Sequence, residues 1–270
     1  MNRYERIIEW VFFHAVEKSE EGLYFERSDL ERASEALGIS CPKNLGDVIY
    51  SFRFRGSMPR SVAQQAPLGK EWVIKGAGKG RYYFALVERV RIIPNENMIV
   101  TKIPDATPEI ISSAAQGDEQ ALLALVRYNR LIDIFLGITA YSLQNHLRTS
   151  VQDIGQVEID EVYVGVDKYG RQYVVPVQAK GHRDEIGVTQ PEQDIAVCQE
   201  KWPNLFPRSV AVQFMPNGEI AMMELAIQGA SVKIVCEAHY RLVQSADISE
   251  EDRELYDMCA QSQSNAFRLQ

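Results

Sequence analysis

Four polar side chains, at alternate positions of two strand-like segments, form the part of the sequence best suited to chemistry. They are Glu158 and Asp160 in the first segment and Gln178 and Lys180 in the second. Side chains alternate between the two faces of a β-strand, so each pair should share a face and the four groups can converge. Burying carboxylates and a lysine costs free energy unless they are paired or bind a cation. The pattern therefore predicts a functional site.

Two strands and a turn must position these groups. Residues 157–164 and 172–180 are strand-like and residues 167–170 have a turn sequence, which together predict a β-hairpin. Pro176 has no N–H group for a sheet hydrogen bond, which predicts a bulge or an edge strand there. The alternative is a purely structural Asp–Lys pair across the hairpin, because exposed cross-strand ion pairs are frequent.

The segments around the hairpin predict helices and further strands. Turn-rich residues 94–108 predict a boundary between a domain at 1–93 and a domain at 94–270. Residues 118–147 have mostly helical apolar spacing, with a break at Gly137 and a renewed helix from Tyr141 to Leu147. We expect further elements at 191–201 (helix), 208–214, 219–227 and 231–236 (strands) and 249–262 (helix). The predicted class is α/β, α+β overall, with a C-terminal mixed sheet flanked by helices.

The first domain begins with three predicted helices. Residues 4–17 and 28–38 have the apolar spacing of amphipathic helices, and Gly38 is placed to end the second one. A third helix can open at Pro42. Its outer surface should carry groups suited to DNA: Lys43, Asn44, Tyr50, Arg53 and Arg55.

A glycine-rich hairpin follows these helices. Strands at 71–75 and 81–87 flank its tip, and Lys75, Lys79 and Arg81 are its candidate DNA-binding residues. The order of three helices and a hairpin resembles a winged helix-turn-helix domain, in which the third helix enters the major groove and the hairpin contacts the DNA backbone. Domains of this kind also serve as protein-interaction modules, and that alternative stays open.

The charge of the chain is unevenly distributed. Its formal net charge is −8, yet residues 50–91 contain nine basic and two acidic residues. A local basic surface on an acidic protein fits a polyanionic partner. The four cysteines, Cys41, Cys198, Cys236 and Cys259, lack the spacing of a zinc site, and we expect buried, reduced thiols. The sequence has no apolar run long enough for a membrane span, and we expect a cytoplasmic protein.

The motif residues resemble the PD-(D/E)xK nuclease superfamily, in which an aspartate on one strand precedes an acid-x-lysine triplet on the next. Asp160 matches the aspartate, and Gln178-Ala179-Lys180 matches the triplet 18 positions later. With the N-terminal domain, the chain resembles a type II restriction endonuclease. The resemblance implies a restriction-endonuclease-like fold that cleaves double-stranded DNA, and a homodimer where the DNA site is palindromic.

The resemblance also implies a divalent metal ion, Mg²⁺ or alternatively Mn²⁺. Its ligands would be Asp160, the Gln178 side chain and the Ala179 backbone carbonyl, because Mg²⁺ prefers oxygen ligands. Gln178 stands where the family usually has an acid, and Glu158 is the candidate for the missing charge. Lys180 would orient or deprotonate the attacking water or stabilise the transition state, and the sequence leaves these roles open.

Two other functions remain possible from the sequence. One is a winged-helix transcription regulator whose C-terminal domain senses a ligand, which explains the basic N-terminal domain equally well but not the four clustered polar groups. The other is a nuclease that acts on branched or damaged DNA, which would retain the chemistry and change the substrate.

Overall fold

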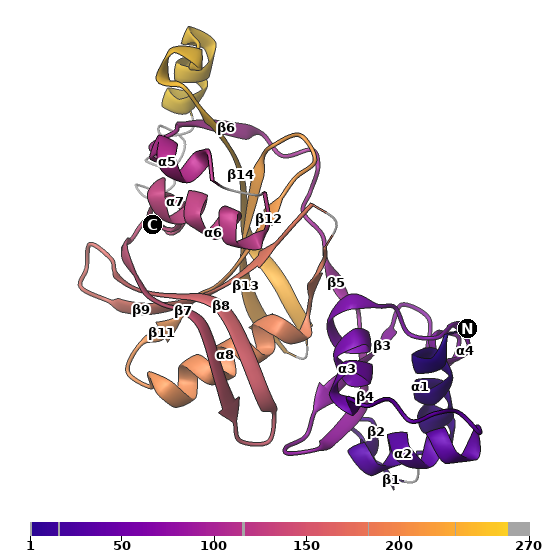
Figure 1. The fold of residues 1–270 in the computed structure, drawn as a ribbon. Helices are drawn as coiled ribbons and strands as arrows, with labels where there is room; N and C mark the ends of the chain where they lie inside the picture. The colour runs from indigo at the N-terminus through magenta and orange to yellow at the C-terminus, as the bar shows by residue number, and fades with distance from the viewer. Residues whose placement is uncertain (1, 16, 115–116, 183, 230, 259–270) are drawn as a thin grey trace.

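The structure, a computed structural model, describes residues 2–258 except 16, 115–116, 183 and 230 (Figure 1). The chain has the expected mixed architecture, with a large mixed sheet flanked by helices. An N-terminal head precedes this sheet. The elements of the head are α1 (Arg3–His14), β1 (Glu17–Lys18), β2 (Leu23–Glu26), α2 (Arg27–Ala36), α3 (Leu45–Tyr50), the π-helical turn η1 (Ser51–Arg55), α4 (Arg60–Ala63), β3 (Glu71–Gly76) and β4 (Arg81–Val87).

The head combines helices with a small sheet in the order β1-β2-β4-β3. Strands β3 and β4 form the predicted glycine-tipped hairpin, and Gly38, at φ +61°, follows the end of α2 in a left-handed conformation. Helix α3 begins at Leu45 and not at Pro42, because the Asn44 side chain accepts a hydrogen bond from the Gly46 N–H and caps the helix. A core of apolar residues from α1, α2, α3 and the hairpin includes Ile7 and Phe84.

The body is built on a mixed sheet in the order β6-β14-β13-β12-β9-β8-β7, with β11 beside β9. Its elements are β5 (Arg91–Ile92), β6 (Val100–Pro104), α5 (Glu109–Ser112), α6 (Glu119–Tyr128), α7 (Leu131–Leu136), β7 (Thr139–Val151), β8 (Gly155–Val166), β9 (Gln172–Lys180), β10 (Ile186–Gly187), α8 (Thr189–Lys201), β11 (Phe206–Pro207), β12 (Ser209–Phe214), β13 (Ile220–Gln228), β14 (Ser231–Val243) and the short 3₁₀ helix η2 (Ser245–Asp247). The β5–β10 pair lies outside the large sheet.

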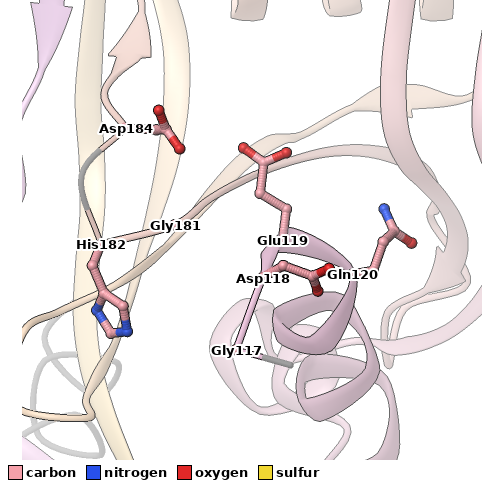
Figure 2. A pocket seen from close by; sticks show the side chains of 7 residues that line it. All are labelled: Gly117, Asp118, Glu119, Gln120, Gly181, His182 and Asp184. Atoms are coloured by element: carbon pink, nitrogen blue, oxygen red, sulfur yellow. The ribbon is translucent and has the colours of Figure 1, made fainter. Parts of the chain in front are cut away.

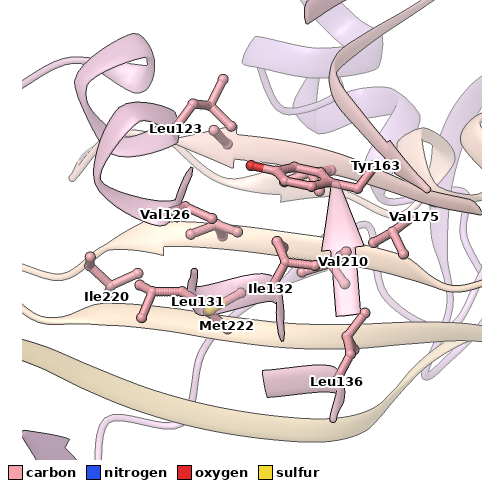
Figure 3. Packing of buried hydrophobic residues seen from close by; sticks show 14 of the residues in the cluster. Leu123, Val126, Leu131, Ile132, Leu136, Tyr163, Val175, Val210, Ile220 and Met222 are labelled. Atoms are coloured by element: carbon pink, nitrogen blue, oxygen red, sulfur yellow. The ribbon is translucent and has the colours of Figure 1, made fainter. Parts of the chain in front are cut away.

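Helices cover the two faces of this sheet. The apolar sides of α6 and α7 pack on one face, where Leu123 and Leu131 lie in one core with Val175 of β9 (Figure 3). Helix α8 lies on the opposite face (Figure 1), where Val197 packs with Val174 of β9. Alternate β9 residues therefore enter two different cores, as expected for a strand that is buried on both faces.

The hairpin of β8 and β9 confirms the prediction, but two neighbouring expectations were wrong. The segment from Tyr141 to Leu147 lies in strand β7 and not in a helix. A register shift between Ser142 and Gln144 interrupts the alternation of side chains, which hid the strand pattern. Pro176 lies opposite Val162 in a central strand, at the point where the neighbour of β9 changes from β11 to β12. No edge or bulge is needed to accommodate it.

Head and body share an apolar cluster. Val73 and Val87 of the head hairpin pack with Ala211 and Met223 of the large sheet. Gly76 lies so close to the body that an added Cβ would be 1.9 Å from the carbonyl oxygen of Ile154. The division at residue 93 stays a prediction, and the hairpin is packed firmly against the body.

Some remaining sequence expectations concern single features. Cys198 is buried as expected, whereas Cys41 and Cys236 are exposed, and Cys259 lies outside the described residues. Residues 250–258 are helical, and the remainder of the helix expected at 249–262 lies beyond the described chain. None of the helices in the described ranges is long and apolar enough to cross a lipid bilayer.

Candidate functional site

The β8–β9 hairpin brings Asp160 next to the Gln178-Ala179-Lys180 triplet. The antiparallel pairing of β8 with β9 begins at Glu161, which lies opposite Val177. Asp160 directly precedes this pair in β8 and so lies at the end of the paired region. The Asp160 Oδ2 atom accepts a hydrogen bond of 2.8 Å from the Ala179 N–H group. This bond fixes the orientation of the carboxylate. Two motif positions that lie far apart in the sequence are thus held together by one contact.

Helix α6 adds a carboxylate that the sequence analysis missed. Glu119, the first residue of α6, lies 3.2 Å from the Lys180 ammonium group, measured from Oε1 to Nζ. The preceding Asp118 caps the helix by accepting a hydrogen bond of 2.9 Å from the Ala121 N–H. Carboxylates are favoured at a helix N-terminus by the helix dipole. The Asp-Glu sequence before the apolar helix was the available signal, although it did not indicate contact with Lys180.

Burial and neighbouring charges act on the Asp160 carboxylate in opposite directions. Burial raises its pKa above the ordinary value, and the negative charge of Glu119 acts in the same direction. The Ala179 hydrogen bond and the positive charge of Lys180 oppose this rise. The site therefore contains two carboxylates close to one ammonium group. A divalent cation would offset the excess negative charge.

A cleft of about 490 Å³ is lined by Glu119. Figure 2 shows Glu119 extending from the first turn of α6, with Asp184 and His182 on the other side of the cleft. Gly181, which directly follows Lys180, also lines the cleft. The end of β9, at Lys180, therefore adjoins a cleft that has room for part of a ligand.

The Gln178 side chain has its hydrogen-bond partners on α8 and β8. It is buried and faces α8, where its Nε2 atom donates to Asp194 Oδ1 at 3.2 Å and to the Glu158 carbonyl oxygen at 3.0 Å. Its Oε1 atom accepts a hydrogen bond of 3.2 Å from Gln190 Nε2. All its polar atoms thus have protein partners. None of these bonds joins Gln178 to Asp160, and the expected role of the Gln178 side chain as a metal ligand stays a prediction.

The Glu158 side chain has its partners on β7. Its exposed carboxylate is 3.1 Å from Arg148 Nη2 and 3.6 Å from His146 Nδ1, both on β7. His146 has a left-handed backbone conformation at φ +48°, and when it is protonated its charge acts to lower the pKa of Asp160. The expectation that Glu158 supplies the missing charge beside Asp160 stays a prediction. The Glu158 carboxylate interacts with Arg148 and His146 of β7, and the Glu158 backbone carbonyl contacts Gln178.

The donor set fits a divalent cation only with help from backbone or water oxygens. In the described ranges, no group of three or more His, Cys, Asp and Glu side chains is arranged to hold a metal ion. Asp160 and Glu119 supply two carboxylates, of which Glu119 lines the cleft, and Mg²⁺ commonly keeps several waters when few protein carboxylates bind it. The Ala179 carbonyl stays a predicted ligand, whereas its N–H already serves Asp160.

The proposed DNA-binding residues of the third helix have different environments. Lys43 is exposed, Asn44 caps α3, and Tyr50 is exposed and packs against Phe54. Arg53 was expected on the outer surface, but it is buried and only 9% exposed, and burial lowers its pKa. The π-helical turn η1 shifts side chains relative to α-helical spacing, which explains the error. The Arg55 side chain lies outside the described part of the structure.

The hairpin cations are partly engaged within the protein. Lys75 Nζ lies 2.7 Å from Glu192 Oε2 on α8, and Arg81 Nη2 lies 2.5 Å from Glu17 Oε1. Lys79 is exposed at the tip. These contacts do not test DNA binding, which would require Lys75 and Arg81 to exchange a protein carboxylate for a phosphate.

Comparisons with protein-family models, with curated proteins and with solved structures found no match for this chain. The Asp160–Lys180 site and the basic head are therefore the features of this chain that bear on its function.

Proposed function

We propose that this chain is a divalent-metal-dependent endonuclease that cleaves double-stranded DNA in the manner of a type II restriction enzyme. The observation that carries the proposal is the contact of Asp160 with Ala179, beside the Lys180–Glu119 pair at the edge of a cleft. A resemblance to the PD-(D/E)xK superfamily agrees with this arrangement. The basic head, which resembles a winged helix-turn-helix domain, would select the DNA.

The protein groups have distinct roles in this proposal. Asp160 and Glu119 would hold Mg²⁺ or Mn²⁺, with the Ala179 carbonyl and waters as further oxygen donors. When bound, the cation offsets the charge of the phosphodiester and lowers the pKa of a bound water. The Ala179 N–H keeps the Asp160 carboxylate in one orientation. This preorganisation reduces the cost of assembling the site.

Lys180 is the residue that would act on the reacting groups. Its ammonium is held by Glu119 beside the cleft and has only 15% of its side chain exposed. From this position it can donate a hydrogen bond to a phosphate oxygen or to the attacking water. A partly desolvated cation stabilises developing negative charge more strongly than one in bulk water, because the surrounding dielectric is lower.

The proposed partners are double-stranded DNA, which the head would bind, and a second copy of the chain. Lys43, Tyr50 and Lys79 present exposed side chains, and Lys75 and Arg81 would add phosphate contacts after leaving their carboxylates. Each phosphate contact releases counterions, so binding should weaken steeply with salt. A homodimer would match a palindromic DNA site, in which the two strands are cut by two equivalent centres.

Plasmid incubation with Mg²⁺ or Mn²⁺ tests this function. The wild type should give discrete linear fragments, and Asp160→Ala and Lys180→Ala should reduce cleavage at least a hundredfold, because each removes a group that acts only at the reacting centre. Glu200→Gln, an exposed change near the end of α8, is the matched control. Cleavage of branched but not linear duplexes would change the proposed substrate. Sequence-selective DNA retardation without cleavage by any divalent ion would instead support the transcription-regulator alternative.

A further inference from the structure

Asp194, on α8, is a fully buried acid with one unpartnered oxygen. Its side chain is 0% exposed, and its Oδ1 atom accepts the 3.2 Å hydrogen bond from Gln178 Nε2. Its Oδ2 atom is buried and has no hydrogen-bond partner among the described residues. An unpartnered buried carboxylate oxygen is unfavourable in either ionisation state, because it has lost water without replacement. The protein retains such a group directly behind the proposed site.

The electrostatic neighbours of Asp194 include two residues of that site. Burial raises the pKa of Asp194 well above its ordinary value, the hydrogen bond from Gln178 opposes this rise, Asp160 adds to it and Lys180 opposes it. Asp194 is therefore close enough to Asp160 to repel it and close enough to Lys180 to attract it. Lys180 is already paired with Glu119. One ammonium group thus serves three acids, which leaves an excess of negative charge when all three are ionised.

The orientation of Gln178 connects Asp194 to the motif. A carboxylate only accepts hydrogen bonds when ionised, so the amide nitrogen of Gln178 faces Asp194. The amide oxygen accepts from Gln190, whose own Oε1 accepts from the Gly187 N–H at 3.2 Å. Because of these contacts, the Gln178 amide group cannot rotate by 180° without losing hydrogen bonds. The neutral residue at the acidic position of the motif is thereby held against an acid from α8.

We propose that Asp194 supports the cation site of Asp160 and Glu119 from α8 and supplies the negative charge that Gln178 lacks. This inference rests on the proposed function and identifies an acid that the sequence motif did not include. Gln178 is then a positioning residue that orients Asp194, and not a ligand that replaces the usual acid. The exposed Glu158 has no part in this charge balance, because its carboxylate pairs with Arg148.

Mn²⁺ binding to the full chain without DNA tests the inference without relying on cleavage. Calorimetric titration of the wild type should give a defined affinity, and Asp194→Asn should weaken it at least about tenfold, as is typical when a group that supports a metal ligand is removed. The double variant Gln178→Glu with Asp194→Asn moves the acid to the strand and keeps an amide–carboxylate pair. It should restore the affinity to within about threefold of the wild type. Glu200→Gln, the same kind of change on an exposed face of α8, should bind as the wild type does.

The possible outcomes separate this inference from the proposed function. Equal Mn²⁺ affinities for the wild type and Asp194→Asn would overturn the role of Asp194 while leaving the nuclease proposal intact. Absence of Mn²⁺ binding by the wild type would overturn both. Thermal unfolding in EDTA checks folding, and Asp194→Asn should unfold at the wild-type temperature or above, because the variant has no buried charge at position 194. If that variant does not fold, a folded double variant that fails to bind Mn²⁺ overturns the inference, and one that binds supports it.

Discussion

Lys75 of the head hairpin and Glu192 of α8 form an ion pair with 2.7 Å between Nζ and Oε2. The two side chains are about equally shielded, at 20% and 21% exposure. Glu192 lies between Gln190 and Asp194 in the sequence, so the same helix contacts the head and supports the buried network behind β9. The hairpin proposed to contact DNA is thus connected to the helix beside the candidate site.

We expect Glu192→Gln to increase DNA affinity at low salt about threefold, because Lys75 would no longer have to leave a carboxylate before contacting phosphate. Fluorescence anisotropy with a labelled duplex measures this change. The difference should shrink at higher salt, and Glu200→Gln should show no gain. If Glu192→Gln and Lys75→Gln both bind with wild-type affinity, Lys75 takes no part in DNA binding.

Glu119→Gln should weaken Mn²⁺ binding at least about tenfold, because it removes a carboxylate that is proposed to hold the cation. Its effect on the free energy of unfolding should stay within about 1 kcal/mol, since Glu119 is 39% exposed and ion pairs at such sites contribute little. Calorimetry and urea denaturation measure the two effects. Glu109→Gln, at the exposed start of α5, is the control. Unchanged Mn²⁺ affinity in Glu119→Gln would exclude that carboxylate from the cation site.

The part of the site formed by neighbouring strands could be predicted from the sequence. Strand alternation and the turn before β9 predict the hairpin, and the hairpin brings Asp160 to the backbone of Ala179. Glu119 could not be placed in the same way. It is 61 positions from Lys180, and only the packing of α6 on the sheet brings the two together. The spacing of apolar residues predicts which side of a helix is buried, but it does not predict which residues of the sheet lie next to the first residue of the helix.

The features that the sequence did not predict have local physical causes. The sequence does not specify which partners the Gln178 amide binds. Its bond to Asp194 depends on the position of α8, which follows β9 in the sequence. Arg53 is rotated inward by a π-helical turn that has no clear sequence pattern. The β7 strand was hidden by a register shift and by extensive exposure at the edge of the sheet. In each case the three-dimensional context overrode a correctly recognised local preference.

The C-terminal helical segment should depend on pH through Asp252. Lys102 and Ser249 bond to its carboxylate and lower its pKa to about 2, with the Lys102 bond as the largest cause. A lowered folded-state pKa means that this stabilisation is present above the ordinary pKa of aspartate. It is lost as the pH falls through the folded-state value of about 2. The protection of residues 250–258 against hydrogen exchange, measured relative to the intrinsic exchange rate at each pH, should therefore fall from about pH 4 downwards. Asp252→Asn should show fast exchange at pH 7 and a weaker pH dependence, and an identical profile in both proteins would contradict this role.

The buried Glu161 carboxylate should make Arg127 important for stability. Glu161 is 0% exposed, and its Oε1 atom lies 2.9 Å from Arg127 Nε on α6. Its Oε2 atom has no partner among the described residues, so removal of the guanidinium leaves a buried, uncompensated charge. Arg127→Met should lower the free energy of unfolding by about 3 kcal/mol in urea denaturation.

The double variant Arg127→Met with Glu161→Gln provides the matched control for this prediction. It removes the stranded charge and should recover at least about 1 kcal/mol relative to Arg127→Met. Equal stability of the single and double variants would show that Arg127 acts through packing and not through charge. Because Arg127 lies on the helix that begins with Glu119, Arg127→Met should also weaken Mn²⁺ binding, and the double variant should restore part of that affinity. The ion pair of Arg127 with the buried Glu161 would then be what keeps α6 in the position that places Glu119 beside Lys180.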